Sequence, residues 1–113
     1  MDTHFVSTAI PYVNASPHIG FALELVLADV IARHARHRWF VAGSDDNSLK
    51  NALAAENAQQ STAAFVAEQV NEFRQLRELL NLSYDDFLST SADARHAPVV
   101  ESLWRRCEAN GDI

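Results

Sequence analysis

Short apolar segments alternate along this chain with longer stretches in which apolar residues recur every three or four positions. The short segments, residues 5–10, 39–43 and 86–89, are typical of buried β-strands. After the first of them, apolar residues return at helical spacing and predict a helix with a single stripe in the core. The members of that stripe are Ile19, Leu23, Val26, Leu27, Val30 and Ile31.

Capping residues indicate where the first and third predicted helices begin. Ser16 followed by Pro17 predicts the start of the first helix, because serine accepts a free backbone N–H and proline fits the first helical position. A second helix is predicted over residues 48–57. Ser61 is predicted to cap a third helix, whose core stripe would be Val66, Val70, Phe73, Leu76 and Leu80.

The last predicted helix is bounded by proline and glycine. Pro98 fits only the first turn of a helix, so the helix is expected to begin near His96 and to end at Asn110-Gly111. Its apolar face would consist of Val99, Val100, Leu103, Trp104 and Cys107.

The order of elements predicts an α/β fold with a three-stranded parallel sheet and flanking helices. Three strands make half of a doubly wound sheet, so the chain is expected to form the first half of a Rossmann-like fold. In the complete arrangement the first strand is paired on both sides. Here one edge of residues 5–10 would stay unpaired, which predicts self-association or pairing with a complementary chain.

Composition restricts the class of protein. A chain of 113 residues forms one small domain, and a net charge of −6 argues against a surface that grips nucleic acid by itself. The basic cluster Arg33, His34, Arg36, His37 and Arg38 is interpreted as the polar end of a helix.

Targeting and metal signals are weak. The single cysteine, Cys107, excludes an internal disulfide and a cysteine-based zinc site within this chain, so no zinc site is expected. The most apolar stretch, residues 21–32, is interrupted by Glu24 and Asp29 and is too short to span a bilayer. The first residues do not resemble a signal peptide, so a cytoplasmic protein without membrane contact is expected.

Candidate chemistry lies in the two loops that leave the first two strands, where open parallel sheets bind ligands. In the first loop, a helix amino terminus favours phosphate, His18 can add a donor, and Gly20 permits close approach of a ligand to the backbone. The alternative is that His18 is solvated or caps the helix. In the second loop, Asp45 or Asp46 could bind an ammonium group. The alternative is that one of them caps the following helix.

These loops together resemble a known family. Residues 9–21, Ala-Ile-Pro-Tyr-Val-Asn-Ala-Ser-Pro-His-Ile-Gly-Phe, resemble the Leu-Pro-Tyr-Ala-Asn-Gly plus His-Ile-Gly-His signature of methionyl-tRNA synthetases. Further landmarks follow in order over nearly the whole chain: Leu27-Ala28-Asp29-Val30, Gly43-Ser44-Asp45, Ala54-Ala55-Glu56, Ser83-Tyr84-Asp85-Asp86-Phe87 and Asn110-Gly111-Asp112-Ile113.

The resemblance implies a class I ligase that activates methionine with ATP, accompanied by Mg2+, and transfers the aminoacyl group to tRNA. Ala9, Ile10, Tyr12 and Asp45 would then bind the amino acid, with Asp45 on its amino group. His18 is implied as the catalytic residue. The contacts to ATP would come from Pro17, His18, Gly20 and Phe21, and no metal ligand is implied within this chain.

The chain departs from the family pattern in several places. Phe21 stands where the second signature histidine is expected, and losing one phosphate-side donor typically costs roughly a hundredfold in rate. Asn47 and Ser48 replace the usual His-Gly, and the chain lacks a few residues between Arg38 and Trp39.

The resemblance also predicts the domain content. Residues 1–113 would be the amino-terminal half of the catalytic domain, and the connective domain with its zinc knuckles, the second half of the nucleotide fold and the anticodon-binding region are absent from them. Contact with tRNA would therefore need completion by those parts, and weak or no activity is expected of this chain alone.

Two alternatives remain from the sequence. One is an amino-acid-activating paralogue in specialised metabolism, which would pass its adenylate to something other than tRNA. The other is a half-domain without catalysis that binds a partner or a small ligand, of which a truncated reading frame is the simplest form.

Overall fold

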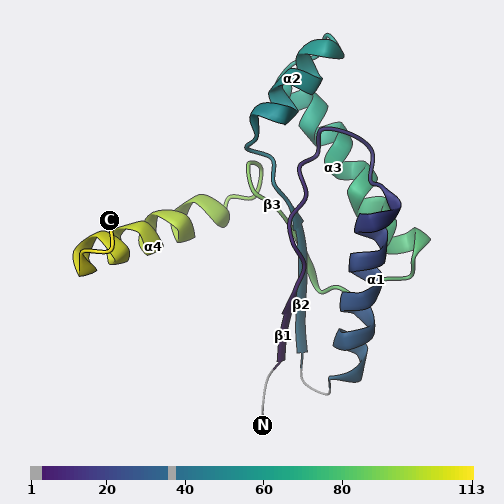
Figure 1. Ribbon diagram of the computed structural model, residues 1–113, viewed down its shortest axis with the longest axis horizontal. Helices are drawn as coiled ribbons and strands as arrows, with labels where there is room; N and C mark the ends of the chain where they lie inside the picture. Colours follow the sequence, from purple (N-terminus) through teal and green to yellow (C-terminus); the bar gives the residue numbers. More distant parts are fainter. Residues whose placement is uncertain (1–3, 36–37) are drawn as a thin grey trace.

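The computed structural model describes residues 4–35 and 38–113, and its elements follow the predicted order (Figure 1). They are β1 (His4–Ser7), α1 (Ile19–His34), β2 (Arg38–Ser44), α2 (Leu49–Asn57), α3 (Thr62–Leu79), β3 (Asp86–Ser89) and α4 (His96–Asn110). The strands form one parallel sheet in the order β1-β2-β3. The predicted fold class is therefore confirmed, although β1 is shorter than residues 5–10.

A glycine allows the second and third strands to meet closely at their carboxyl ends. A side-chain Cβ on Gly43 would lie 2.6 Å from the carbonyl oxygen of Leu88 and 3.2 Å from Cγ2 of Ile10. The missing side chain therefore lets Ile10, which follows β1, rest on β2.

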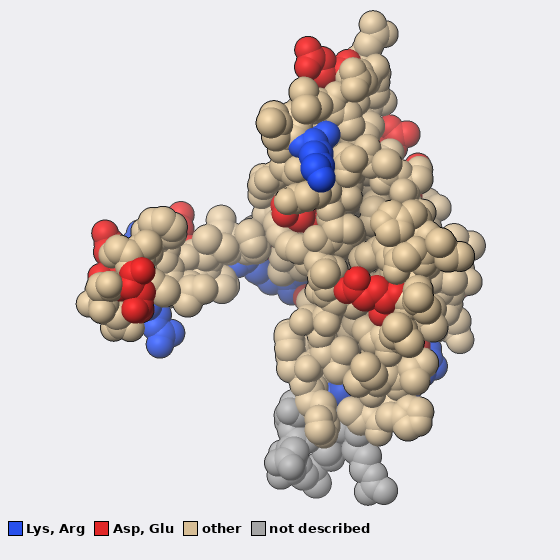
Figure 2. Space-filling view, viewed as in Figure 1, with Lys and Arg blue, Asp and Glu red and all other residues tan. Residues whose placement is uncertain are grey.

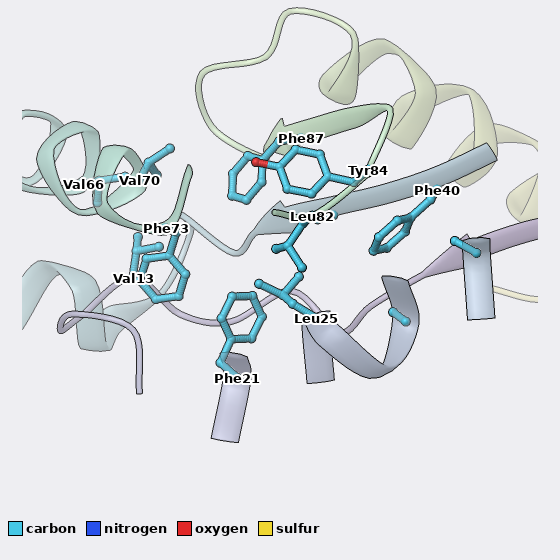
Figure 3. Packing of buried hydrophobic residues seen from close by; sticks show 13 residues of the cluster. Val13, Phe21, Leu25, Phe40, Val66, Val70, Phe73, Leu82, Tyr84 and Phe87 are labelled. Atoms are coloured by element: carbon cyan, nitrogen blue, oxygen red, sulfur yellow. The ribbon is translucent and has the colours of Figure 1, made fainter. Parts of the chain in front are cut away.

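The core lies between one face of the sheet and the helices α1 and α3 (Figure 3). Aliphatic and aromatic side chains fill it, and the rings of Phe40 and Tyr84 meet edge to face with centroids 6.2 Å apart. The core comprises Val13, Phe21, Leu25, Ala28, Ala32, Phe40, Ala42, Val66, Val70, Phe73, Leu82, Tyr84 and Phe87.

The buried side of α1 is not the predicted one. All six residues of the predicted stripe are exposed, Ile19 by 89%, so the expectation that they pack in the core is wrong for this chain. The small side chains of Ala28 and Ala32 instead let the helix lie close to the sheet. Phe21 and Leu25, on the same side of the helix, fill the core between helix and sheet. The stripe predicted for α3 is confirmed at Val66, Val70, Phe73 and, partly, Leu76, whereas Leu80 is exposed.

Two further apolar surfaces are uncovered. Phe5 and Trp39 are paired neighbours on β1 and β2, and both point to the sheet face opposite the core and are exposed. Helix α4 has the predicted bounds, with Gly111 as a left-handed cap at φ 78°, but none of its residues is buried. It projects away from the body of the molecule (Figure 1), so its predicted apolar face is exposed at Val99, Val100, Leu103 and Trp104, whereas Cys107 is half-buried.

A buried carboxylate fastens α1 to the turn before β3. Asp29 accepts hydrogen bonds from the backbone N–H of Ser83 at 2.6 Å, from its hydroxyl at 2.7 Å and from Nε of Arg33 at 2.5 Å. Burial disfavours the charged form, but these donors outweigh it and lower the pKa of Asp29 below its ordinary value.

The basic cluster has a structural role where the structure describes it. Arg33 pairs with Asp29, and Arg38 pairs with Asp85 at 2.7 Å. Arg36 and His37 lie outside the described residues.

Candidate functional site

The loops after β1 and β2 lie side by side at the carboxyl edge of the sheet. The backbone N–H of Asp45 donates to the carbonyl oxygen of Pro11 at 2.8 Å, and Tyr12 forms an isolated parallel bridge with Asp45. This places the two sequence-predicted segments together at the edge where open parallel sheets bind ligands.

Two hollows open beside the first loop. Their volumes are about 270 Å³ and 300 Å³, and Pro11, His18 and Phe21 line both. The first extends along Tyr12, Asn14, Ala15, Ser16 and Phe73, and the second along Ala9, Gly20 and Glu24. None of the lysine and arginine residues that the structure describes lines either hollow, and Pro17 lines neither.

His18, not Ser16, caps helix α1. Its Nδ1 accepts the backbone N–H groups of Gly20 at 3.1 Å and Phe21 at 3.3 Å, so the predicted start at Ser16-Pro17 is wrong. Because Nδ1 is an acceptor, the proton of the neutral imidazole is on Nε2. The ring therefore combines both roles weighed from the sequence: it caps the helix and leaves one N–H as a donor.

The helix terminus is arranged around this ring. A Cβ on Gly20 would lie 3.0 Å from both Cε1 and Nδ1 of His18, so glycine makes room for the capping ring. The ring of Phe21 is buried against Phe73 with centroids 5.3 Å apart. Since the N–H groups of Gly20 and Phe21 are already bonded, the His18 ring is the stronger candidate donor to a phosphate.

The candidate amino-acid contacts gather around Asp45. Its side chain is half-buried, and its Oδ1 accepts the backbone N–H of Asn47 at 3.2 Å. Beside it, the Tyr12 ring is partly exposed with Nζ of Lys50 5.1 Å from its centroid. No described lysine, arginine or histidine forms an ion pair with Asp45, which leaves its carboxylate available to an ammonium group.

The backbone N–H of Ala9 is already used. It donates to Oε1 of Glu24 at 2.7 Å, which joins the end of the first strand segment to α1. A contact from Ala9 to an amino acid would therefore come from its carbonyl or its methyl group.

Neither acid of the second loop caps α2. That role belongs to Ser48, whose hydroxyl accepts the N–H of Lys50 at 3.1 Å, so the capping alternative for Asp45 and Asp46 is wrong. Asp46 is buried, and its carboxylate accepts from Ser44, Ser89 and Ser91. Burial disfavours its ionisation, but these hydrogen bonds outweigh that effect and lower its pKa.

Sequence reasoning missed this role of Asp46. The available signal was the Ser-Thr-Ser run at residues 89–91, because the ends of neighbouring parallel strands meet at one edge of the sheet.

The described residues contain no group of three or more His, Cys, Asp or Glu side chains that could hold a metal ion. Among the same residues, no helix is long and apolar enough to cross a membrane. On the face shown in Figure 2, lysine and arginine are scattered and form no continuous basic patch.

Comparisons with known proteins agree with these observations. A model of the family described as tRNA synthetases class I (M) matches residues 4–113. The chain is 43% identical to a methionine–tRNA ligase of Mycobacterium tuberculosis, over 100% of this chain and 22% of the relative. It is 34% identical to a methionine–tRNA ligase of Brucella suis, over 99% of this chain and 22% of the relative.

A solved structure is similarly close. The Mycobacterium tuberculosis methionyl-tRNA synthetase in complex with methionyl-adenylate has a TM-score of 0.92 and 40% identity, covering 98% of this chain and 22% of that one. The chain thus spans about a fifth of the length of the curated relatives it matches, at 22%.

Proposed function

Since this chain belongs to the tRNA synthetases class I (M) family, we propose that it carries the amino-acid and ATP-phosphate contacts of a methionine-activating site. The observation that carries the proposal is the hydrogen bond between Asp45 and Pro11, which joins a carboxylate without an ion-pair partner among the described residues to the loop that ends in His18. Residues 1–113 would form the amino-terminal half of a catalytic domain, and the connective, zinc, second-half and anticodon-binding regions would lie outside them.

The proposed reaction needs positioning more than a protein nucleophile. A carboxylate oxygen of methionine attacks the α-phosphorus of ATP, the bond to the bridging oxygen breaks, and pyrophosphate leaves with the electron pair. Asp45 would hold the ammonium group, with Ile10 and Tyr12 beside the side chain of methionine. The Nε2–H of His18 would donate to phosphate oxygens as their charge grows.

The remaining contacts to ATP are proposed at the same terminus. Gly20 and Phe21 hold the His18 ring in place, and Pro17 precedes it. Mg2+ would enter with the phosphates of ATP rather than on ligands from this chain.

Transfer of the aminoacyl group to tRNA in the cytoplasm is the second step that we propose for the complete enzyme. With a net charge of −6, this chain is a poor surface for a phosphate backbone, so the basic contacts to tRNA would come from outside residues 1–113.

The uncovered apolar surfaces support a polypeptide partner. The outer side of α1 and the open face of the sheet expose Leu27, Phe5 and Trp39 among others, and monomers rarely leave such patches bare. We therefore propose that a complementary part of a synthetase covers them, and that the isolated chain associates with itself.

A titration of the 113-residue chain with a non-hydrolysable methionyl-adenylate analogue, followed by amide NMR shifts, tests the proposal. The largest shifts are expected at residues 9–21 and 43–48, and the leucyl analogue is expected to bind more weakly. The absence of binding, or shifts confined to α4, would overturn it.

A further inference from the structure

A hydroxyl-lined cage encloses the carboxylate of Asp46, which is 4% exposed. Its Oδ1 accepts from the Ser44 hydroxyl at 2.7 Å, and its Oδ2 accepts from the Ser89 hydroxyl. The same Oδ2 accepts from the backbone N–H of Ser91 at 3.0 Å and from its hydroxyl at 2.9 Å. With these donors in place, the carboxylate has little capacity left for a ligand.

We propose that Asp46 is a positioning residue for Asp45: it fastens the end of β2 to the loop after β3 so that the neighbouring carboxylate is held toward the ammonium group of the amino acid. This inference rests on the proposed function of Asp45 and adds a specificity device to the same site.

The fastening crosses between two strands. Besides its side-chain bonds, the backbone N–H of Asp46 donates to Oγ1 of Thr90 at 2.9 Å. Side chain and backbone of one residue therefore both bind residues 89–91, which lie on the neighbouring strand and its exit loop. The side-chain bonds and the backbone bond of Asp46 are two independent links, and together they fix the orientation of the loop at Asp46 relative to the end of β2.

The constraint reaches Asp45 through the backbone. The side chain of Asn51, fully buried, donates from Nδ2 to the carbonyl oxygens of Asp45 at 3.0 Å and Asp46 at 2.9 Å. On the other side, the N–H of Asp45 is bonded to Pro11. Both peptide groups of Asp45 are thus held, and its side chain is the part left to meet a ligand.

The cage also separates the roles of two adjacent acids. An unshielded second carboxylate would compete with Asp45 for an ammonium group. Hydroxyl and amide donors already surround both oxygens of Asp46, whereas Asp45 accepts only the N–H of Asn47 at Oδ1 and keeps Oδ2 without a partner among the described residues. This arrangement predicts that Asp46 affects ligands that carry an ammonium group and has no effect on ligands that lack it.

The test measures, by NMR titration of the full chain, the affinity for the methionyl-adenylate analogue and for the same analogue without its amino group. The ratio of these affinities is the readout, because general loss of structure would lower both. In the wild type the amino form is expected to bind about ten- to a hundredfold more tightly, the range of one charge-assisted hydrogen bond.

Asp46→Ala is expected to lose most of that ratio, whereas Asp46→Asn is expected to keep it. An asparagine oxygen can still accept from Ser91, and its amide can donate to the Ser44 hydroxyl. In an Asp45→Ala background, Asp46→Ala is expected to have no further effect on the ratio. If Asp46→Ala does not fold, Ser91→Ala removes one donor of the cage and is expected to reduce the ratio by a smaller factor.

The affinity ratios of these variants test the inference and the proposed function separately. An unchanged ratio in Asp46→Ala, or in the folded Ser91→Ala if Asp46→Ala cannot be made, overturns the inference. An equal loss in Asp46→Ala and Asp46→Asn means that Asp46 acts through its charge, which also overturns it. If the wild type shows no preference for the amino form, or Asp45→Ala does not change that preference, the proposed function itself fails.

Discussion

The Nδ1 atom of His18 accepts the backbone N–H of Gly20 at 3.1 Å, and a Cβ on Gly20 would lie 3.0 Å from that same nitrogen. The histidine and the glycine of the candidate phosphate loop therefore depend on each other. The glycine leaves space for the ring, and the ring satisfies the helix terminus. Because Nδ1 accepts these bonds, the proton of the neutral ring is on Nε2, and this N–H is left as a donor outside the helix cap.

Two substitutions at His18 separate its cap from its donor. His18→Ala removes both and is expected to lower the free energy of unfolding by about 1 kcal/mol, the usual cost of a lost cap. His18→Asn keeps a good capping side chain and is expected to stay near wild-type stability. Both variants should bind ATP or its analogue more weakly. Urea titration and nucleotide binding measure the two effects, and wild-type nucleotide affinity in His18→Asn would exclude the donor role.

Asp29→Asn is expected to destabilise the chain at pH 7 by about 1–3 kcal/mol, because the donors of Ser83 and Arg33 lose a charged acceptor that is itself buried. The pKa of Asp29 is lowered on folding from an ordinary value of 3.8. Its contribution is therefore complete above that value and is lost as pH falls through the lower pKa of the folded state.

Urea titrations of wild type and Asp29→Asn at pH 7, 5 and 3 measure this contribution. The difference in free energy of unfolding should be constant at the two higher values and smaller at the lowest. A difference that does not change with pH would mean that the charge on Asp29 contributes nothing to stability.

Leu27→Glu is expected to reduce self-association of the chain, because it places a charge on the uncovered side of α1. Leu53→Glu is a matched control on α2, since the two leucines are 56% and 50% exposed. Light scattering at micromolar concentration should show a smaller average mass for Leu27→Glu only. A monodisperse wild-type monomer would contradict the proposed use of this surface.

The 113-residue chain by itself is expected to show no methionine-dependent exchange of pyrophosphate into ATP. None of the described lysine or arginine residues lines either hollow, so the phosphate charge that develops in the transition state meets the proposed His18 donor without a cationic lysine or arginine beside it. A Gly20→Trp variant, in which the loop is blocked, provides the background. Exchange clearly above that background would show that this chain is sufficient for activation.

Local signals predicted the elements well, because each rests on neighbouring residues. Ser61 caps α3 and Gly111 ends α4, as capping chemistry indicated. The buried side of α1 could not be chosen in this way, since the helix is apolar on two sides and periodicity cannot tell which of them meets the sheet. The small residues Ala28 and Ala32 decide it through close packing.

The site was predictable in outline but not in its hydrogen bonds. Topology places the loops after β1 and β2 at one edge, and the structure joins them at Pro11 and Asp45. Asp46 is enclosed by hydrogen bonds and Asp45 is not, because residues 89–91 bind Asp46 and not Asp45. Ser89 lies 43 positions from Asp46 in the sequence. Contacts of that range cannot be read from local spacing.

The most direct measurement grafts this chain into the Mycobacterium tuberculosis methionyl-tRNA synthetase, in place of the segment it matches, and assays methionine-dependent exchange of pyrophosphate into ATP. The graft should be active, because the two chains share 40% identity and the same fold with a TM-score of 0.92. The same graft with Asp45→Ala should lose most of its activity through a higher KM for methionine. A folded graft without exchange, or an Asp45→Ala graft as active as its parent, would contradict the assignment of these loops to methionine activation.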